Sequence, residues 1–123
     1  MSMHSVLIIE DDEFVKNMLK QTFERAGYDV ATASNGRIGI QLYKTKPFNV
    51  VITDLIMPDM EGIETMMRLR KLDPGVKVTA ISGGGRNRPD EYLHLATKLG
   101  ALSTFKKPVD RTALLYAAQA LVS

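Results

Sequence analysis

Two short, almost wholly apolar runs lead directly into acidic side chains. Residues 50–53 run into Asp54, and residues 6–9 run into the acidic group at residues 10–12. Short uninterrupted runs rich in β-branched residues are typical of strands that are buried on both faces. The pattern therefore predicts two buried strands, each of which delivers carboxylates to a loop at its C-terminal end.

The rest of the chain alternates between strand-like runs and the spacing of amphipathic helices. Gly27 is placed to end the first helix, and Asn35 and Asp110 are placed to cap the N-termini of two later helices. Phe14 and Ile38 are expected to face inward from their helices. The patterns predict strands over residues 6–9, 28–33, 50–54, 76–81 and 103–106, and helices over residues 13–26, 37–44, 63–71, 91–99 and 111–121.

Five strands that alternate with five helices indicate a parallel sheet with helices on both faces, because right-handed crossovers place the connecting helices there. We therefore predict an α/β fold with a doubly wound sheet. At 123 residues the chain fits a single domain, residues 1–123, in which residues 1–4 lie outside the fold. The chain ends soon after the last predicted helix, so no output domain is expected within it.

Composition excludes several classes of function. There is no Cys, which rules out disulfides, thiolate metal sites and Cys nucleophiles. The net charge is +2, from 16 basic and 14 acidic residues, and the basic residues are scattered, so no direct nucleic-acid partner is expected. The apolar runs are too short to span a membrane, and the N-terminus has no export signal. We expect a cytoplasmic protein.

The C-terminal ends of parallel strands share one edge of the sheet, where doubly wound folds bind their ligands. Five groups that follow predicted strands belong to this edge: Glu10, Asp11, Asp54, Ser82 and Lys107. Crowded carboxylates repel one another unless a cation lies between them, and Mg²⁺ prefers oxygen ligands. A carboxylate can also attack phosphorus when a cation screens the incoming charge. The sequence thus predicts a Mg²⁺-assisted phosphoryl site with Asp54 as the nucleophile.

Ser82 and Lys107 offer the groups that a phosphorylated product needs. The Ser82 hydroxyl can donate to one phosphoryl oxygen, and the Lys107 ammonium can pair with another. The alternative interpretations are a turn residue before a glycine run and a solvated lysine. A nucleotide-binding loop at residues 83–85 is a further alternative, but no Gly-Lys-Ser/Thr sequence follows it.

The chain resembles the receiver domain of bacterial two-component response regulators, such as chemotaxis regulators. The resemblance covers almost the whole chain and rests on an ordered set of motifs: Glu10-Asp11-Asp12, Asp54, Met57-Pro58-Asp59-Met60-Glu61-Gly62, Ser82-Gly83 and Lys107-Pro108. It implies a flavodoxin-like (βα)5 fold with the strand order 2-1-3-4-5. It also implies a cis peptide bond between Lys107 and Pro108.

The resemblance also implies roles for the acids at the predicted edge. Asp54 matches the aspartate that accepts a phosphoryl group from a histidine kinase or phosphotransfer protein. The same aspartate is also a ligand of the metal. Asp11 matches a direct Mg²⁺ ligand, and Glu10 matches an acid that acts through water. The main-chain carbonyl of Ile56 matches a further ligand, whereas Asp12 is a flanking acid.

The implied function is phosphorelay signal transduction without enzymatic turnover. Ser82 and Lys107 match the groups that hold the transferred phosphoryl group. Phosphorylation would then alter the face of the fourth helix, fifth strand and fifth helix, to which an unknown downstream protein binds, in a monomer or a phosphorylation-dependent dimer. One family feature is missing: the usual aromatic residue three positions before the lysine is Thr104, and Phe105 is expected to point to the other face.

Two other functions stay open. A phosphatase with an aspartate nucleophile would use a similar acid and Mg²⁺, but it usually has a second Asp two residues later, where this chain has Ile56. A phosphate-independent protein-interaction module would have lost part of the site. Every member of the acid, hydroxyl and lysine set is present in the sequence, which favours the phosphoacceptor.

Overall fold

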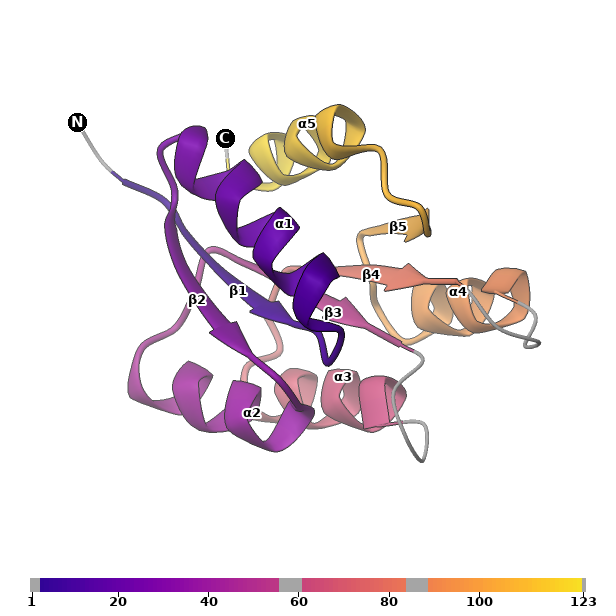
Figure 1. Ribbon diagram of the computed structural model, residues 1–123. Coiled ribbons are helices and arrows are strands. Elements are labelled where there is room, and N and C mark those ends of the chain that lie inside the picture. The colour runs from indigo at the N-terminus through magenta and orange to yellow at the C-terminus, as the bar shows by residue number, and fades with distance from the viewer. Residues whose placement is uncertain (1–2, 56–60, 84–88, 123) are drawn as a thin grey trace.

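The computed structural model describes residues 3–55, 61–83 and 89–122. Within them, five strands alternate with five helices along the chain, as the sequence predicts (Figure 1). The strands are β1 (Ser5–Ile9), β2 (Asp29–Ala33), β3 (Val50–Asp54), β4 (Val78–Ser82) and β5 (Ser103–Lys106). The helices are α1 (Glu13–Arg25), α2 (Gly36–Thr45), α3 (Glu61–Leu72), α4 (Pro89–Lys98) and α5 (Arg111–Val122). None of these helices is long and apolar enough to cross a membrane.

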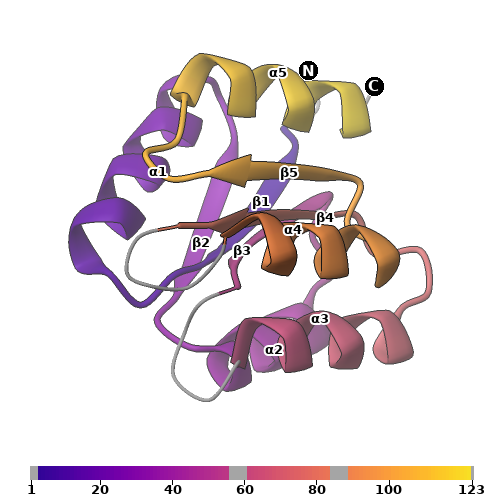
Figure 2. The ribbon, with the colours of Figure 1, turned by 90° about the vertical axis from the view of Figure 1, so that its right-hand side faces the viewer.

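All five strands are parallel and form one sheet in the order β2-β1-β3-β4-β5. α1 and α5 cover one face of this sheet, and α2, α3 and α4 cover the other (Figure 1, Figure 2). The predicted doubly wound, flavodoxin-like fold is confirmed. Because the strands are parallel, the C-terminal ends of β1, β3, β4 and β5 lie at one edge of the sheet.

Side chains that alternate along the central strands build two hydrophobic layers. Leu7 and Ile9 of β1 belong to the layer under α2, α3 and α4, whereas Val6 and Ile8 belong to the layer under α1 and α5. Every residue of β1 and β3 is buried, which is why their sequences are nearly continuous apolar runs. The two layers pack against these strands from both sides. This packing fixes the positions of the side chains at the C-terminal ends of β1 and β3.

The predicted helix caps are confirmed. Asn35 Oδ1 accepts a hydrogen bond from the N–H of Ile38 at 2.9 Å, and Asp110 Oδ1 accepts one from the N–H of Ala113 at 3.1 Å. Gly27 follows α1 with a φ of +92°, the left-handed conformation that favours glycine. The local sequence therefore determines where α1 ends and where α2 and α5 begin.

The predicted inward orientation of Phe14 and Ile38 is wrong. Phe14 is 79% exposed and Ile38 is 42% exposed. In α1 the buried face includes Lys16, which is two residues after Phe14 and therefore about 200° away around the helix. In α2 the buried face includes Gly39, where a Cβ would lie 2.4 Å from Ile9 Cδ1. α2 therefore approaches β1 through a glycine, which apolar periodicity does not reveal.

The bounds of β4 and α3 also differ from the prediction. β4 begins at Val78, two residues late, and includes Ser82. α3 begins at Glu61, two residues early, so Gly62 lies in its first turn. The Glu61 carboxylate accepts a hydrogen bond from the N–H of Gly36, which joins the first turn of α3 to the first turn of α2. This tertiary contact extends α3 beyond the start that its apolar spacing indicates.

The orientation predicted for Phe105 is confirmed. Phe105 belongs to the layer under α1 and α5. Its neighbour Thr104 pairs in register with Ala80, which belongs to the opposite layer under α4. The aromatic ring and the threonine therefore lie on different faces of β5.

Candidate functional site

Three carboxylates from two neighbouring strands meet at the C-terminal edge of the sheet. Glu10 and Asp11 follow β1, and Asp54 is the last residue of β3, which pairs with β1 so that Ile9 is opposite Thr53. Ligand oxygens of the three acids lie within 4.8 Å of one another. Glu10 is 0% exposed and Asp54 is 2% exposed, while Asp11 is open to solvent. The structure thus brings together the three acids that the sequence singles out.

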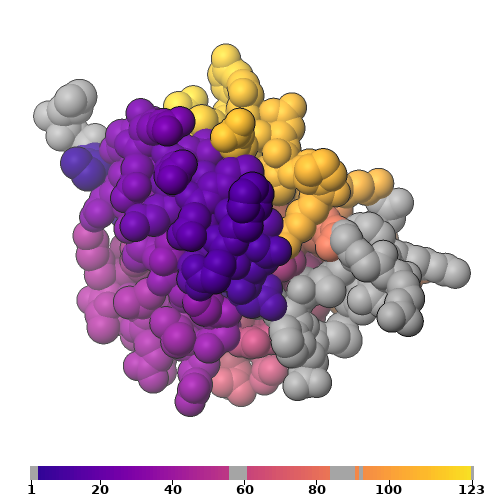
Figure 3. Space-filling model, viewed as in Figure 1, coloured from indigo at the N-terminus to yellow at the C-terminus, as the bar shows by residue number. Residues whose placement is uncertain are grey.

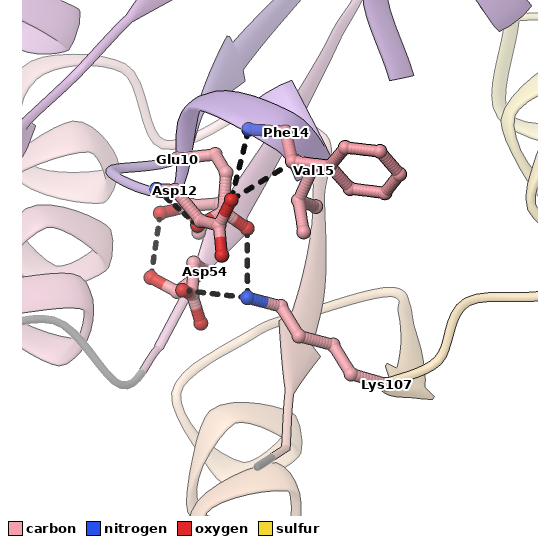
Figure 4. A network of polar contacts seen from close by, with 7 residues as sticks. Glu10, Asp12, Phe14, Val15, Asp54 and Lys107 are labelled. Carbon is pink, nitrogen blue, oxygen red and sulfur yellow. Dashed lines mark hydrogen bonds and ion pairs between the residues drawn. The ribbon is translucent and has the colours of Figure 1, made fainter. Parts of the chain in front are cut away.

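The turn after β1 orients Glu10 into the site. The N–H of Asp12 donates to Glu10 Oε2 at 3.0 Å, and the N–H of Glu10 donates to the carbonyl oxygen of Ala33 at 3.0 Å. Asp12 itself caps α1, because its Oδ1 accepts from the N–H groups of Phe14 and Val15 (Figure 4). In the sequence Asp12 is only a flanking acid, yet its place directly before a helical pattern is the signal of an N-cap.

Lys107 reaches two of the carboxylates from the connection between β5 and α5 (Figure 4). Its Nζ lies 2.9 Å from Glu10 Oε1 and 3.1 Å from Asp54 Oδ2, and its side chain is 19% exposed. The Lys107–Pro108 peptide bond is cis, as the resemblance implies. Burial lowers the pKa of Lys107, but the contact with Glu10 and the charge of Asp54 outweigh this effect and raise the pKa above its ordinary value. The lysine is therefore a firmly charged ammonium.

One ammonium does not balance the charge of the buried acids. Burial raises the pKa of Glu10 to about 7, and the negative charge of Asp54 contributes to this rise. The hydrogen bond from Asp12 and the contact with Lys107 lower this pKa only in part. A carboxyl group that binds a proton near neutral pH marks a site that is short of positive charge.

Ser82 ends β4 beside Asp54. Ile81 pairs with Asp54 in the register of β3 and β4, so Ser82 stands one residue further toward the same edge. Ser82 is fully buried, and its hydroxyl has no hydrogen-bond partner in the part of the chain that the structure describes. Such a hydroxyl is suited to donate to a group that enters the site. Ile56, whose main-chain carbonyl is a further expected ligand, lies outside the described residues.

The donor set at this edge fits Mg²⁺. Glu10, Asp11 and Asp54 offer carboxylate oxygens, which are the protein ligands that Mg²⁺ takes. Mg²⁺ is usually held by one or two carboxylates and keeps several waters, which leaves positions for a phosphate oxygen. The shortage of positive charge and the oxygen donors both support a Mg²⁺ site formed by these three residues.

The helix that follows the site packs against the end of β3 through Gly62. A Cβ at this position would lie 2.2 Å from the carbonyl oxygen of Asp54 and 2.4 Å from the Cα of Leu55. These are backbone atoms, which cannot rotate away as the end of a flexible side chain can. The absence of a side chain at Gly62 therefore allows the first turn of α3 to lie directly against Asp54.

Gly62→Ala is expected to lower the free energy of unfolding by about 1 to 2 kcal/mol. Overpacking typically costs ~1–3 kcal/mol, and the better helix propensity of alanine offsets up to ~1 kcal/mol of this. Urea unfolding followed by circular dichroism measures the change. Gly75→Ala is the matched control, because the nearest described atom to a Cβ there, apart from its chain neighbours, is Asp73 Oδ1 at 3.4 Å, an ordinary contact. An equal loss of stability in both variants would argue against the packing role of Gly62.

Comparison with known proteins shows the family. Residues 6–119 match the response regulator receiver domain. The chain is 36% identical over 104 residues to the chemotaxis protein CheY of Thermotoga maritima, and the match covers 84% of each protein. It is 32% identical over 112 residues to the transcriptional regulatory protein GlrR of Escherichia coli, where the match covers 91% of this chain and 24% of that protein.

Solved structures show the same relationship. A response regulator receiver domain protein from Clostridium thermocellum is 28% identical and superposes with a TM-score of 0.88 over 98% of this chain and 94% of that chain. A CheY-like receiver domain protein from Methanospirillum hungatei is 29% identical, with a TM-score of 0.86 over the same shares of the two chains, 98% and 94%. The chain therefore belongs to the receiver domain family of two-component response regulators.

Proposed function

We propose that Asp54 is the phosphoacceptor of this receiver domain and that Mg²⁺ assists the transfer. The observation that supports this most strongly is the meeting of the acids with the Lys107 ammonium at one edge of the sheet. Receiver domains interact with histidine kinases or phosphotransfer proteins, so the donor is a phosphohistidine on such a partner. In this function the domain is a regulatory phosphoacceptor of the cytoplasm and not an enzyme.

In the proposed transfer, a carboxylate oxygen of Asp54 attacks phosphorus, and the bond from phosphorus to the imidazole nitrogen of the donor breaks. The electron pair of that bond leaves with the imidazole, and the product is an acyl phosphate. Mg²⁺, held by Asp11 and Asp54 and through water by Glu10, would screen the repulsion between the carboxylates and the incoming phosphoryl group. The main-chain carbonyl of Ile56 remains an expected further ligand.

Lys107 and Ser82 are the residues that bind the product in this proposal. The ammonium contacts Asp54 Oδ2 at 3.1 Å, so a small movement pairs it with a phosphoryl oxygen on that carboxylate. The Ser82 hydroxyl, which lacks a partner within the described ranges, gains a hydrogen bond when it turns to another phosphoryl oxygen. Movement of Ser82 toward Asp54 is then the first step of the signal.

We expect this signal to reach the face formed by α4, β5 and α5. Ser82 pairs with Lys106 in the register of β4 and β5, so a shift at Ser82 is passed directly to β5. Thr104 stands where the family usually has an aromatic ring, and the relay in this chain therefore works without that ring. A downstream protein would bind this face of a monomer or of a phosphorylation-dependent dimer.

The rim of the site offers a contact for a protein donor. Phe14 is 79% exposed in the first turn of α1, and its ring points away from the acids (Figure 4). The space-filling view shows α1 at the surface of the molecule (Figure 3). Exposed aromatic side chains are enriched at protein interfaces, where they act as anchors. This exposure supports a protein as the phosphoryl donor.

Intact-mass spectrometry with a small phosphoryl donor tests the proposal. With Mg²⁺ and acetyl phosphate, we expect the chain to gain the mass of one phosphoryl group, and with EDTA in place of Mg²⁺ we expect a much slower gain. Hydroxylamine should remove the gain, because it cleaves acyl phosphates. The proposal fails if the chain gains nothing with Mg²⁺ present, or if the gain resists hydroxylamine.

A further inference from the structure

α2 and α3 lie side by side on one face of the sheet and are joined at both ends (Figure 1, Figure 2). At their N-termini, the Glu61 carboxylate accepts a hydrogen bond from the N–H of Gly36. At their C-terminal ends, the Tyr43 hydroxyl donates to Asp73 Oδ2 at 2.6 Å, and Asp73 directly follows α3. The two helices therefore run in the same direction and form one packed pair.

Each helix of this pair buries one side and exposes the other. α2 buries Gly36, Gly39 and Tyr43, and α3 buries a side that includes Met66 and Leu69. Side chains three, four and seven residues apart share one side of a helix, so the exposed positions of each helix form a stripe that faces outward. The α2–α3 face consists of these exposed residues: Arg37, Ile38, Gln41, Lys44, Glu64, Met67, Arg68 and Lys71.

This part of the chain is more basic than the rest. Residues 36–46 and 61–72 together contain six basic and two acidic side chains, a net charge of +4 in a chain whose total is +2. The remaining residues therefore carry a net charge of −2. Basic residues that are scattered along the sequence thus gather where α2 and α3 pack together.

Both acids of the two helices are already engaged, whereas several cations are not. Glu61 bonds to the backbone of α2, and Glu64 pairs with Arg68 at 3.0 Å. Three exposed cations of the α2–α3 face form no ion pair with any residue that the structure describes: Arg37, Lys44 and Lys71. The face therefore presents positive charge that its own acids do not neutralise.

We propose that the α2–α3 face binds an acidic, amphipathic helix of a partner protein. Ile38 is 42% exposed and Met67 is 55% exposed, and these apolar side chains can contact the apolar strip of such a helix. The unpaired cations then meet the carboxylates beside that strip, and complementary charges speed association and fix the orientation of the partner. The α2–α3 face shares no residue with the phosphoacceptor site or with α4, β5 and α5, so the inference goes beyond the proposed function.

The number of cations favours a protein over a membrane or a nucleic acid. Segments that recognise anionic lipids typically carry clusters of about 4–8 Lys or Arg, and DNA-binding proteins can make about 6–10 phosphate contacts. The three unpaired cations of the α2–α3 face fall short of both. The exposed Ile38 and Met67 side chains also gain nothing from phosphates, whereas an amphipathic helix offers apolar groups and carboxylates together.

NMR titration of the ¹⁵N-labelled chain tests the proposal. The probe is a synthetic helical peptide with leucines along one side and glutamates on both flanks, and the reference peptide has glutamine in place of every glutamate. We expect the acidic peptide to shift amide resonances of α2 and α3 and to bind about tenfold or more tightly than the reference. This binding should weaken as NaCl is raised, because salt screens exposed charges.

Two variants of the α2–α3 face examine its charged and its apolar part. The first combines Arg37→Glu, Lys44→Glu and Lys71→Glu, and it should bind the acidic peptide about tenfold or more weakly than the wild type does. The second is Met67→Ser, which keeps every charge and should also weaken binding. Should the first variant be unfolded, Met67→Ser and the salt dependence of the wild type still decide the outcome.

A charge-reversed control separates this face from the net charge of the domain. It combines Lys20→Glu, Arg25→Glu and Lys98→Glu, which reverse three exposed cations of α1 and α4. Its net charge equals that of the first variant, yet it should bind the acidic peptide within about twofold of the wild type. Equal losses of affinity in the two charge-reversed variants overturn the proposal.

Other outcomes also overturn it. One is an acidic peptide that leaves the resonances of α2 and α3 unchanged, or that binds no more tightly than the reference peptide. Another is a shift of these resonances with phosphatidylserine vesicles or duplex DNA but not with the acidic peptide, because the occupant would then be a membrane or a nucleic acid. The titration needs no phosphoryl group, so failure of the proposed function would leave this test unaffected.

Discussion

Asp54→Asn is expected to abolish phosphoryl uptake while the chain stays folded. An amide is a far weaker nucleophile than a carboxylate and forms no acyl phosphate, yet asparagine keeps the shape of the side chain at the end of β3. The substitution also removes one of the two negative charges in contact with Lys107 and eases the repulsion that raises the pKa of Glu10. After incubation with Mg²⁺ and acetyl phosphate, intact-mass spectrometry should show no gain.

Asp110→Asn is the matched control for this experiment. Asp110 is an exposed acid that caps α5 by accepting a hydrogen bond from the N–H of Ala113 at 3.1 Å. An asparagine oxygen accepts the same hydrogen bond, so we expect wild-type uptake and wild-type stability. Uptake by Asp54→Asn at the wild-type rate would show that another residue is the acceptor.

Glu10→Gln is expected to stabilise the metal-free domain by about 2 to 3 kcal/mol at pH values above about 7. Burial and the charge of Asp54 raise the pKa of Glu10 from 4.5 to about 7, so the folded domain binds more protons than the unfolded chain between these pH values. The stability of the wild type therefore falls as the pH rises through this range, and the loss is complete above the folded-state pKa. Glutamine carries no charge, so the stability of Glu10→Gln does not fall in this way as the pH rises.

Urea unfolding in EDTA at about pH 5 and about pH 8 measures this difference. Circular dichroism is the appropriate probe, because the chain contains no Trp. Glu24→Gln, which removes an exposed carboxylate of α1, should leave the pH dependence of the wild type intact. If the stability of Glu10→Gln fell with pH as steeply as that of the wild type, the buried charge of Glu10 would not be its cause.

The same buried carboxylates affect both the stability of the domain and its proposed function. The charge of Glu10, buried beside Asp54, destabilises the metal-free fold as the pH rises, yet both acids are also proposed to hold Mg²⁺. A ligand that binds only the folded state stabilises it to an extent that grows with its concentration and affinity. Mg²⁺ should therefore raise the stability of the wild type more than that of Glu10→Gln. Such a trade of stability for activity is common at functional sites.

The fold and the meeting of the acids could be predicted because buried parallel strands have a characteristic sequence pattern. Residues 6–9 and 50–53 are almost wholly apolar, since helices cover both faces of β1 and β3. Parallel pairing alone then brings the residues after these runs to one edge. The positions of Glu10 and Asp54 follow from that geometry, although nothing in the sequence indicates that one Lys107 ammonium contacts both acids.

What the sequence does not reveal depends on contacts between distant segments. Phe14 has the spacing of an inward residue, but the way α1 rotates against the sheet leaves it exposed. Gly62 resembles an ordinary breaker, whereas its position is set by the backbone of Asp54. These features require the packed structure, because a glycine in the sequence does not show which atoms come close to it.

The location of the phosphoryl group on the wild-type chain is the most direct test of the proposed mechanism. Borohydride reduces an aspartyl phosphate to homoserine, so peptide mass spectrometry of a reduced reaction with Mg²⁺ and acetyl phosphate identifies the acceptor residue. We expect homoserine at Asp54 and at no other position. Homoserine at Asp11 or at any other acid in place of Asp54 would contradict the proposal that the buried carboxylate at the end of β3 is the nucleophile.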